Sequence, residues 1–238
     1  MNRVSFVPSG GEFKGEEPGG GFPLPVLLLF SVLVGILLSL MIVPGWLPGL
    51  VRSLQGEQPT AFWLLSRASA LVSFGLLWLS MLLGLLITSK TARLWPGSPT
   101  AFDLHEHTSL LGLLFALLHA LLLLGDQYIH FQPLQLALPF ASTAYRPFAV
   151  GLGQLAFYAW VILIGSFYLR KQISPSAWRA LHWTSFLAFG LSLVHGITAG
   201  TDSSAALMMG FYWMASGSVL FLFAYRIALL VIPREKKG

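Results

Sequence analysis

Six apolar runs, each long enough to cross a bilayer, constrain the fold of this chain more than any other feature of its sequence. The hydrocarbon core of a bilayer is about 30 Å thick, and a helix needs about 20 mostly apolar residues to span it. Backbone polar groups in lipid must be satisfied internally, so the runs predict helices rather than open sheets. We therefore expect an all-α fold, a polytopic membrane bundle of six helices. The runs lie at about 24–43, 61–88, 104–124, 147–169, 179–200 and 206–232.

The composition agrees with a membrane protein and excludes several kinds of site. Charged residues make up 10% of the chain, whereas a soluble domain has about 25%. The chain has no cysteine, which excludes disulfides, thiolate zinc sites, cysteine-ligated iron–sulfur clusters and covalently attached c-type heme. The formal net charge is +5. In a membrane protein, excess Lys and Arg are expected in cytoplasmic loops, so we expect no nucleic-acid partner.

The charge distribution predicts the orientation of the bundle. Residues 1–22 are polar and Gly-rich, which predicts a flexible cytoplasmic tail. We expect residues 23–233 to form the six-helix transmembrane domain, the part that would bind any cofactor, and 234–238 to form a basic cytoplasmic end. By the positive-inside rule both termini are cytoplasmic in a multi-pass protein of the cell membrane. Nine cations define the inner side (Lys90, Arg93, Arg170, Lys171, Arg179, Arg226, Arg234, Lys236 and Lys237) and three the outer side (Arg52, Arg67 and Arg146).

Four of the six histidines lie at matching depths in the third and fifth runs. His105 and His182 stand at the cytoplasmic starts of these runs, and His119 and His195 near the external ends. Spacings of fourteen and thirteen residues separate the two levels by about 20 Å along a helix. Ionisable side chains at membrane depth mark function by default, and neutral imidazole is a good axial ligand for heme iron. We therefore expect two b hemes, the inner held by His105 and His182, the outer by His119 and His195.

Two histidine ligands fill both axial positions of the iron, so such a heme transfers electrons rather than binding a gas. The azimuths fit this arrangement only in part. On a straight helix His119 returns to within roughly 40° of His105, whereas His195 lies about 140° from His182. We expect a bend or local tightening near Gly190, helix tilt or different rotamers to make up the difference.

Cationic side chains near the two levels are candidates to pair with heme propionates. Arg67 lies in the outer half of the second helix. It either pairs with a propionate of the outer heme or extends its side chain to the external lipid headgroups. Arg146 opens the fourth helix and has the same two alternatives, or binds an anionic or quinone-like acceptor. Arg93 and Arg179 are candidates to pair with propionates of the inner heme, although the general excess of Lys and Arg on the cytoplasmic side also explains both.

Three more residues have competing interpretations. Gly112 lies midway between the two histidines of the third helix, where it admits either a macrocycle or a neighbouring helix. His107 is rotated about 200° from His105 on the same helix. We expect it at the surface; the alternative is that His107 replaces His105 as the ligand of the inner heme. His130 lies in the connection 125–146 and is either structural or a metal ligand. This connection is longer than most and either follows the membrane surface or covers an external site.

The segments HEHTSLLGLLFALLH and WRALHWTSFLAFGLSLVH resemble the ferric reductase-like transmembrane domain, over about residues 60–200. That superfamily includes ferric reductases, NADPH oxidases and the heme-binding membrane subunit of the periplasmic methionine sulfoxide reductase system. The resemblance implies a six-helix plan with the same two histidine pairs. SRASALVSFGLLWLS resembles the second helix of bacterial members, which supports a role for Arg67. RPFAVGLGQ and WRALHW are similar to the methionine sulfoxide reductase partner, whose members typically lack a histidine at position 105.

These observations predict a transmembrane di-heme electron-transfer protein, ferric reductase-like, that moves electrons from the cytoplasmic to the external face. As an oxidoreductase component it would have no flavin or NAD(P)H domain, because the sequence ends at Gly238. We expect a separate donor, a flavoprotein reductase or quinol, and leave the external acceptor open. One alternative is a heme-binding subunit that passes quinol- or flavin-derived electrons to a periplasmic enzyme such as methionine sulfoxide reductase. Another is a heme-free scaffold or transporter whose histidines only tie helices together.

Overall fold

The structure of the protein, a computed structural model, falls into two units, Met1–Val51 and Arg52–Gly238. In the first unit the described residues are helical and belong to the run expected at 24–43. The predicted tail 1–22, the basic end 234–238 and Arg52 lie outside the described residues. The structure describes residues 30–35, 37–38, 41, 60–126, 129–143 and 145–231.

The described part of the second unit contains only helices, and five of its spans are long and apolar enough to cross a membrane. These spans confirm the all-α class and the predicted helices from the second to the sixth. They are α3 (Thr60–Thr88), α4 (Ser98–Leu122), α6 (Pro147–Leu169), α7 (Pro175–Trp183) continued by α8 (Ser185–Ala199), and α9 (Ala206–Val231). The connections contain the short helices η1 (Thr91–Arg93), η2 (Leu123–Gly125) and α5 (Pro133–Ala137).

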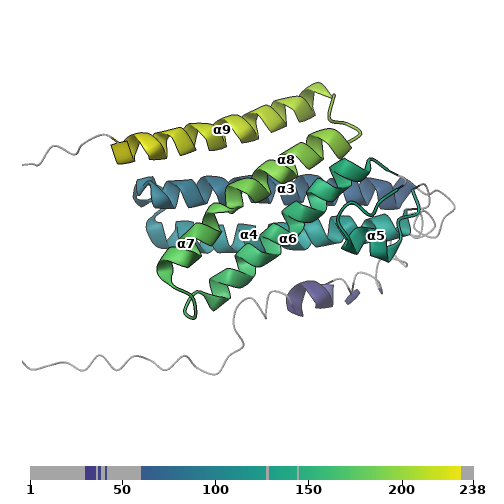
Figure 1. The fold of residues 1–238 in the computed structure, drawn as a ribbon, viewed down its shortest axis with the longest axis horizontal. Helices are drawn as coiled ribbons and strands as arrows, with labels where there is room; N and C mark the ends of the chain where they lie inside the picture. The colour runs from purple at the N-terminus through teal and green to yellow at the C-terminus, as the bar shows by residue number, and fades with distance from the viewer. Residues whose placement is uncertain are drawn as a thin grey trace, which may run out of the picture. The chain divides into compact units, whose positions relative to one another are not determined.

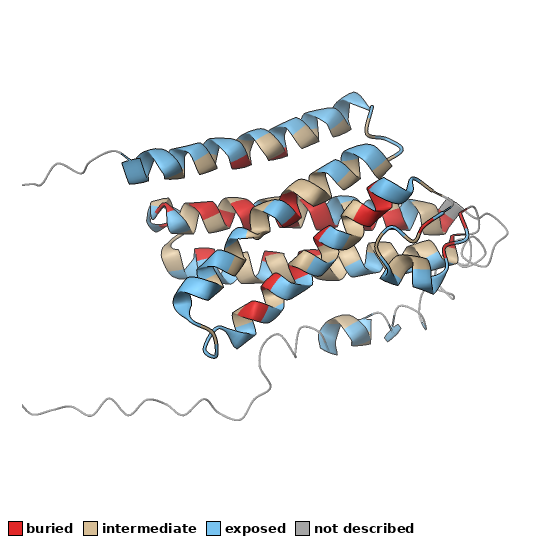
Figure 2. Cartoon of the chain, viewed as in Figure 1, coloured by how far each residue is buried: buried red, intermediate tan, exposed pale blue. Residues whose placement is uncertain are grey.

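The packing of the second unit is built on neighbouring helix pairs. α3 packs along α4, α6 packs against α8, and α9 packs against α3 (Figure 1). The main core joins α3, α6, α8 and α9, and its buried side chains lie on the faces that the helices turn toward one another (Figure 2). The buried members are Phe74, Leu77, Met81, Leu85, Trp160, Phe189, Ala215 and Val219.

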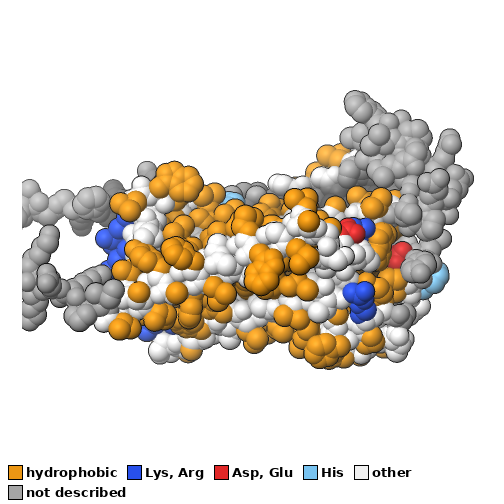
Figure 3. Space-filling model, turned by 90° about the horizontal axis from the view of Figure 1, so that it is seen from above, with side chains coloured by type: hydrophobic (Ala, Val, Ile, Leu, Met, Phe, Trp, Pro, Cys, Tyr) orange, Lys and Arg blue, Asp and Glu red, His pale blue; other side chains and the backbone are white. Residues whose placement is uncertain are grey.

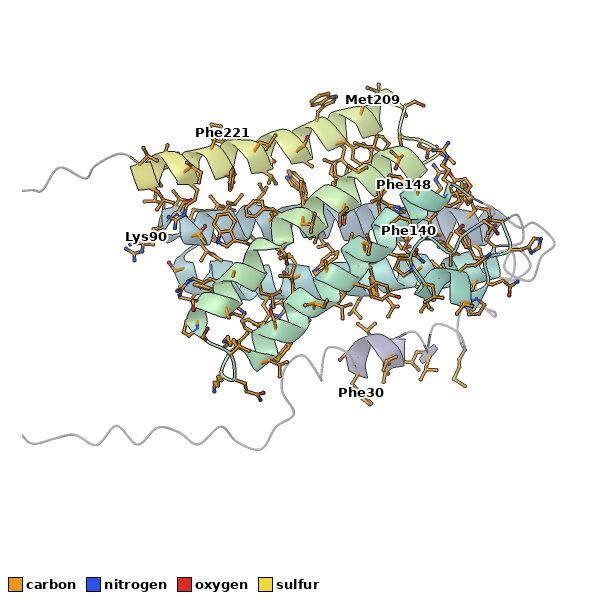
Figure 4. The ribbon with its side chains drawn as sticks, in the orientation of Figure 1. Phe30, Lys90, Phe140, Phe148, Met209 and Phe221 are labelled. Carbon is orange, nitrogen blue, oxygen red and sulfur yellow. The ribbon has the colours of Figure 1, made fainter. Side chains whose placement is uncertain are left out.

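The surface of this unit is apolar between its ends. On the face shown in Figure 3, Lys and Arg side chains lie toward both ends and Asp or Glu side chains toward one, and the stretch between them is mostly hydrophobic. Lys90 marks one end of the helices and Phe148 the other (Figure 4). Large apolar side chains are widely exposed, including Trp213 at 74% and Phe221 at 70%. Such a large exposed apolar surface indicates contact with lipid rather than water.

α4 begins six residues before the start expected at 104. Its N-cap, Gly97, has φ of 104°, in a region that glycine adopts without strain. Pro99 lies in the first turn, where its fixed φ suits a helix and its missing N–H is not needed. The apolar run marks the hydrocarbon core, whereas the helix continues outward through polar residues. His105 therefore lies about two turns inside α4.

The fifth predicted helix is interrupted at Thr184, six residues before Gly190, where we expected the tightening or bend. The N–H and the hydroxyl of Thr184 both donate to the carbonyl of Leu181, at 2.9 and 2.7 Å. This three-residue spacing tightens the last turn of α7 before α8 begins, and threonine hydroxyls commonly compete for backbone groups in this way. Gly190 lies inside α8, with no other heavy atom within 4 Å of the place a Cβ would occupy.

Candidate functional site

The structure brings the four membrane-depth histidines together as two pairs. The ring centroids of His105 and His182 lie 6.1 Å apart with the rings at 71°, and those of His119 and His195 lie 6.2 Å apart at 66°. Each pair joins α4 to the α7–α8 span, and all four side chains are partly buried. These are the pairs that depth along the helices predicts, and their role as heme ligands stays a prediction.

The separation within each pair suits one metal ion held between two imidazoles. With a metal–nitrogen bond of about 2.0 Å and about 1.2 Å from that nitrogen to the ring centre, two ligands on opposite sides of an ion have centroids about 6.4 Å apart. The observed values are 6.1 and 6.2 Å. A direct hydrogen bond between two imidazoles would bring nitrogens within about 3 Å and the centroids correspondingly closer. No hydrogen bond joins the two rings of either pair among the contacts of the described residues.

Backbone carbonyls fix the tautomer of three of the four histidines. Nδ1 of His105 donates to the carbonyl of Ser80 at 2.9 Å, and Nδ1 of His119 donates to that of Ser66 at 2.9 Å. Nδ1 of His195 donates to the carbonyl of Ala149 at 2.8 Å. A carbonyl oxygen only accepts, so Nδ1 carries the proton and, in the neutral ring, Nε2 keeps a free lone pair. Metal-binding histidines are held in this way by their second nitrogen.

His182 is held differently. Its ring stacks on Trp178, with centroids 5.1 Å apart and an angle of 22°. Nε1 of Trp178 is buried and has no hydrogen-bond partner among the described residues. An indole N–H usually finds a partner when it is buried. The free donor beside His182 therefore fits a site whose remaining acceptor belongs to a bound group.

A cavity of about 520 Å³ adjoins the second pair, within the range of about 300–1,000 Å³ that is usual for cofactor sites. His119 and His195 both line it, together with apolar side chains of α3, α4, α6 and α9. Ile129, Phe131 and Leu136 of the connection 125–146 complete the wall. The connection therefore covers this site, one of its two predicted roles.

Two side chains of α6 hold α5 over the cavity. Nε2 of Gln154 donates to the carbonyls of Gln135 and Leu136, at 2.7 and 2.9 Å. The hydroxyl of Tyr158 donates to the carbonyl of Ala137 at the end of α5. The cover is thus a hydrogen-bonded part of the fold.

Two glycines make room for large rings. A Cβ at Gly153 would lie 2.6 Å from Nδ1 of His195, so the absent side chain lets this ring lie against the α6 backbone. A Cβ at Gly112 would lie 2.6 Å from the ring of Trp160. Of the two interpretations of Gly112, the structure therefore supports close packing with a neighbouring helix.

Arg67 and Arg146 both have partners within the protein. Arg67 forms an ion pair with Asp202 and lies over the ring of Trp63 at 5.9 Å. Arg146 donates from Nη1 to the carbonyl of Thr198, near the end of α8. Arg67 lines the cavity, and the propionate roles of Arg67 and Arg146 stay predictions. Sequence reasoning did not identify Asp202 as the partner of Arg67.

The remaining candidates lie outside the histidine pairs. His107 is exposed, and its Nδ1 donates to the carbonyl of Asp103, one turn back on the same helix, at 2.6 Å. His130 is also exposed, as are Arg93 and Arg179. Across the described ranges, no three His, Asp or Glu side chains come together to form a metal site. A bis-histidine heme needs only two such side chains.

Comparison with known proteins identifies a family and nothing further. A family model described as a domain of unknown function (DUF8596) matches residues 61–202. The match covers more than half of the chain and extends from α3 through α8 to Asp202, so it includes both histidine pairs. No curated protein and no solved structure matches the chain. The protein therefore belongs to the DUF8596 family.

Proposed function

We propose that this protein is a transmembrane b-type di-heme electron-transfer protein that resembles ferric reductases. In this proposal His105 and His182 hold an inner heme, and His119 and His195 hold an outer heme. Electrons would pass from the cytoplasmic to the external face, and the four histidines would supply the nitrogens that hold the two hemes. The donor is a separate flavoprotein reductase or a quinol, and the external acceptor is open.

The spacing of the two histidine pairs carries this proposal. Each pair has ring centroids 6.1 or 6.2 Å apart, close to the distance that a shared metal ion requires. Three of the rings donate from Nδ1 to a carbonyl, which leaves Nε2 free to bind a metal.

The surroundings of the outer pair support the same function. The cavity of about 520 Å³ has mostly apolar walls and a hydrogen-bonded cover, so a bound cofactor would be shielded from water. When bound, heme supplies a one-electron carrier whose potential depends on its ligands and their hydrogen bonds. The protein residues would supply the four histidine nitrogens, and they fix the tautomer of three of these rings and place Arg67 at the cavity wall.

Histidine substitutions in the full-length protein test this function. We expect His195→Ala to lose the outer heme and keep the inner one, because it removes one ligand of a single pair. His107→Ala is the matched control, since its exposed ring bonds to its own helix, and it should keep both hemes. Heme is quantified per chain as the pyridine hemochromogen after expression with added heme precursor. Two hemes in His195→Ala would contradict the ligand assignment, and heme loss in His107→Ala would move the inner ligand from His105 to His107.

A further inference from the structure

Three serines on α3 face three positions on α4 in one antiparallel register. The serines lie seven residues apart, and so do the positions they face, because two turns of helix bring a side chain back to nearly the same face. Each serine hydroxyl bonds to its counterpart, at 2.9, 2.9 and 3.0 Å. The pairs are Ser66 with His119, Ser73 with Gly112, and Ser80 with His105.

The direction of the outer hydrogen bonds follows from the number of protons available. Oγ of Ser66 lies 2.9 Å from Nδ1 of His119 and 3.1 Å from the carbonyl oxygen of the same residue. A hydroxyl has one proton, and the carbonyl can only accept it. The Ser66 hydroxyl therefore donates to the carbonyl, and its oxygen accepts from Nδ1–H. The imidazole proton is shared between two oxygens of Ser66, the hydroxyl and the backbone carbonyl.

The inner hydrogen bonds form the same arrangement with one more hydroxyl. Ser109 donates to the carbonyl of His105 at 2.7 Å, which uses its only proton. The 2.6 Å contact between Ser80 and Ser109 is therefore donated by Ser80. With its proton used in this way, Oγ of Ser80 accepts from Nδ1–H of His105 at 3.0 Å. The inner imidazole proton is thus also shared by a hydroxyl and a carbonyl of one serine.

We propose that Ser66 and Ser80 are positioning residues that each increase the electron donation from one histidine Nε2 to heme iron. Ser66 acts on His119 at the outer heme, and Ser80 acts on His105 at the inner heme. This inference rests on the proposed function. An acceptor on Nδ1–H orients the ring and makes Nε2 more basic, and a more basic ligand favours ferric over ferrous iron. The two serines act separately, because each one contacts a single histidine.

A purely structural role for the serines predicts a different result, and Ser73 supplies the comparison. Ser73 belongs to the same stripe and ties α3 to α4 through the Gly112 carbonyl. It also lines the cavity, but no hydrogen bond joins it to a histidine among the described residues. It is 6% exposed, against 1% for Ser66 and 5% for Ser80. Ser73→Ala therefore reproduces the loss of a buried interhelical hydroxyl without removing an acceptor from a ring.

The experiment is a potentiometric titration of full-length wild type, Ser66→Ala, Ser80→Ala and Ser73→Ala, followed at the heme absorption bands. The component missing from His195→Ala identifies the outer heme. We expect Ser66→Ala to raise the midpoint potential of the outer heme only and Ser80→Ala that of the inner heme only. Ser73→Ala should leave the inner potential at its wild-type value and change the outer potential less than Ser66→Ala does, because it removes no acceptor from a ring.

Each outcome has a defined meaning. Loss of only the matching heme also supports the inference, because it shows that the serine is needed at one site. Equal shifts in all three alanine variants, a shift at the wrong heme or unchanged potentials would overturn it. Wild type that binds no heme would instead overturn the proposed function. If Ser80→Ala does not fold, Ser109→Ala replaces it, because the Ser80 hydroxyl then loses its acceptor, and the inner potential should rise alone.

Discussion

Replacing Gly153 by alanine should remove the outer heme while leaving the inner one in place. Gly153 lies on α6 directly against the ring of His195. A Cβ added there would lie 2.6 Å from Nδ1 and 2.8 Å from Cε1 and Cγ. Carbon atoms in contact prefer separations of about 3.5–4.0 Å, so the ring has to retreat by about 1 Å. The Ala149 carbonyl holds the same edge of the ring, because it accepts a hydrogen bond from Nδ1 at 2.8 Å.

A displacement of this size is large compared with what a metal site tolerates. Ligand distances in metal sites hold to within about 0.2 Å of their preferred values, so a shift of about 1 Å removes the His195 ligand. The cost to folding is smaller: overpacking costs about 1–3 kcal/mol, and alanine recovers up to about 1 kcal/mol over glycine within a helix. The variant is therefore expected to fold with one site damaged.

Gly165→Ala is the matched control for Gly153→Ala. Gly165 lies on the same helix, and a Cβ there would have no other heavy atom within 4 Å. Both proteins are purified in detergent, and heme per chain and the low-temperature α-band spectrum are measured. Gly153→Ala should bind half the heme of wild type, and Gly165→Ala the full amount. A Gly153→Ala protein with two hemes and an unchanged spectrum would refute the assignment of His195 as a ligand.

Three further predictions concern residues around the two sites. Trp178→Ala should lower occupancy of the inner heme, because the His182 ring loses the indole on which it stacks; full occupancy, measured as heme per chain, would show that the stack is dispensable. Asp202→Asn breaks the ion pair with α3, and because both side chains are partly exposed it should cost at most about 1 kcal/mol; a large fall in melting temperature would contradict this. Leu136→Ala should admit water through the cover of the cavity and increase solvent access to the outer heme. We expect a soluble reductant to reduce that heme faster than in wild type; an unchanged rate of reduction would mean that the cover does not shield the heme.

The sequence predicted the helices well because hydrophobicity over 20 residues is a strong signal. The span expected at 147–169 coincides with α6, and that at 61–88 differs from α3 by one residue. The predicted depths of the histidines also agree with the pairs that the structure forms. Depth depends only on helix rise and on the limits of each apolar run, which are both readable in a sequence.

Local geometry was harder to predict. The azimuth of His195 relative to His182 required some departure from a straight helix, and Gly190 was the expected place for it. The break lies at Thr184, where a hydroxyl and an N–H share the carbonyl of Leu181. Glycine permits a bend but does not cause one, whereas a threonine hydroxyl competes actively for a backbone carbonyl.

The hydrogen-bond partners of the histidines were also missed, although a signal for them was present. Ser66, Ser73 and Ser80 repeat every seven residues, as do the histidines of α4 with Gly112 between them. A short connection makes two successive helices antiparallel, so two seven-residue series can be aligned in opposite directions. The partner of His195 left no such signal, because it is the backbone carbonyl of Ala149 and backbone contacts do not depend on the identity of the side chain.

The central claim, that the two histidine pairs hold two b hemes, is tested most directly by the heme content of the wild-type protein. The full-length chain is expressed with adequate heme supply and purified in detergent. Its reduced-minus-oxidised spectrum is then recorded together with heme quantified per chain. We predict b-type α and Soret bands and two hemes per chain. Protein that is folded and monodisperse but lacks Soret absorption would contradict the account and favour a scaffold or transporter whose histidines only join helices.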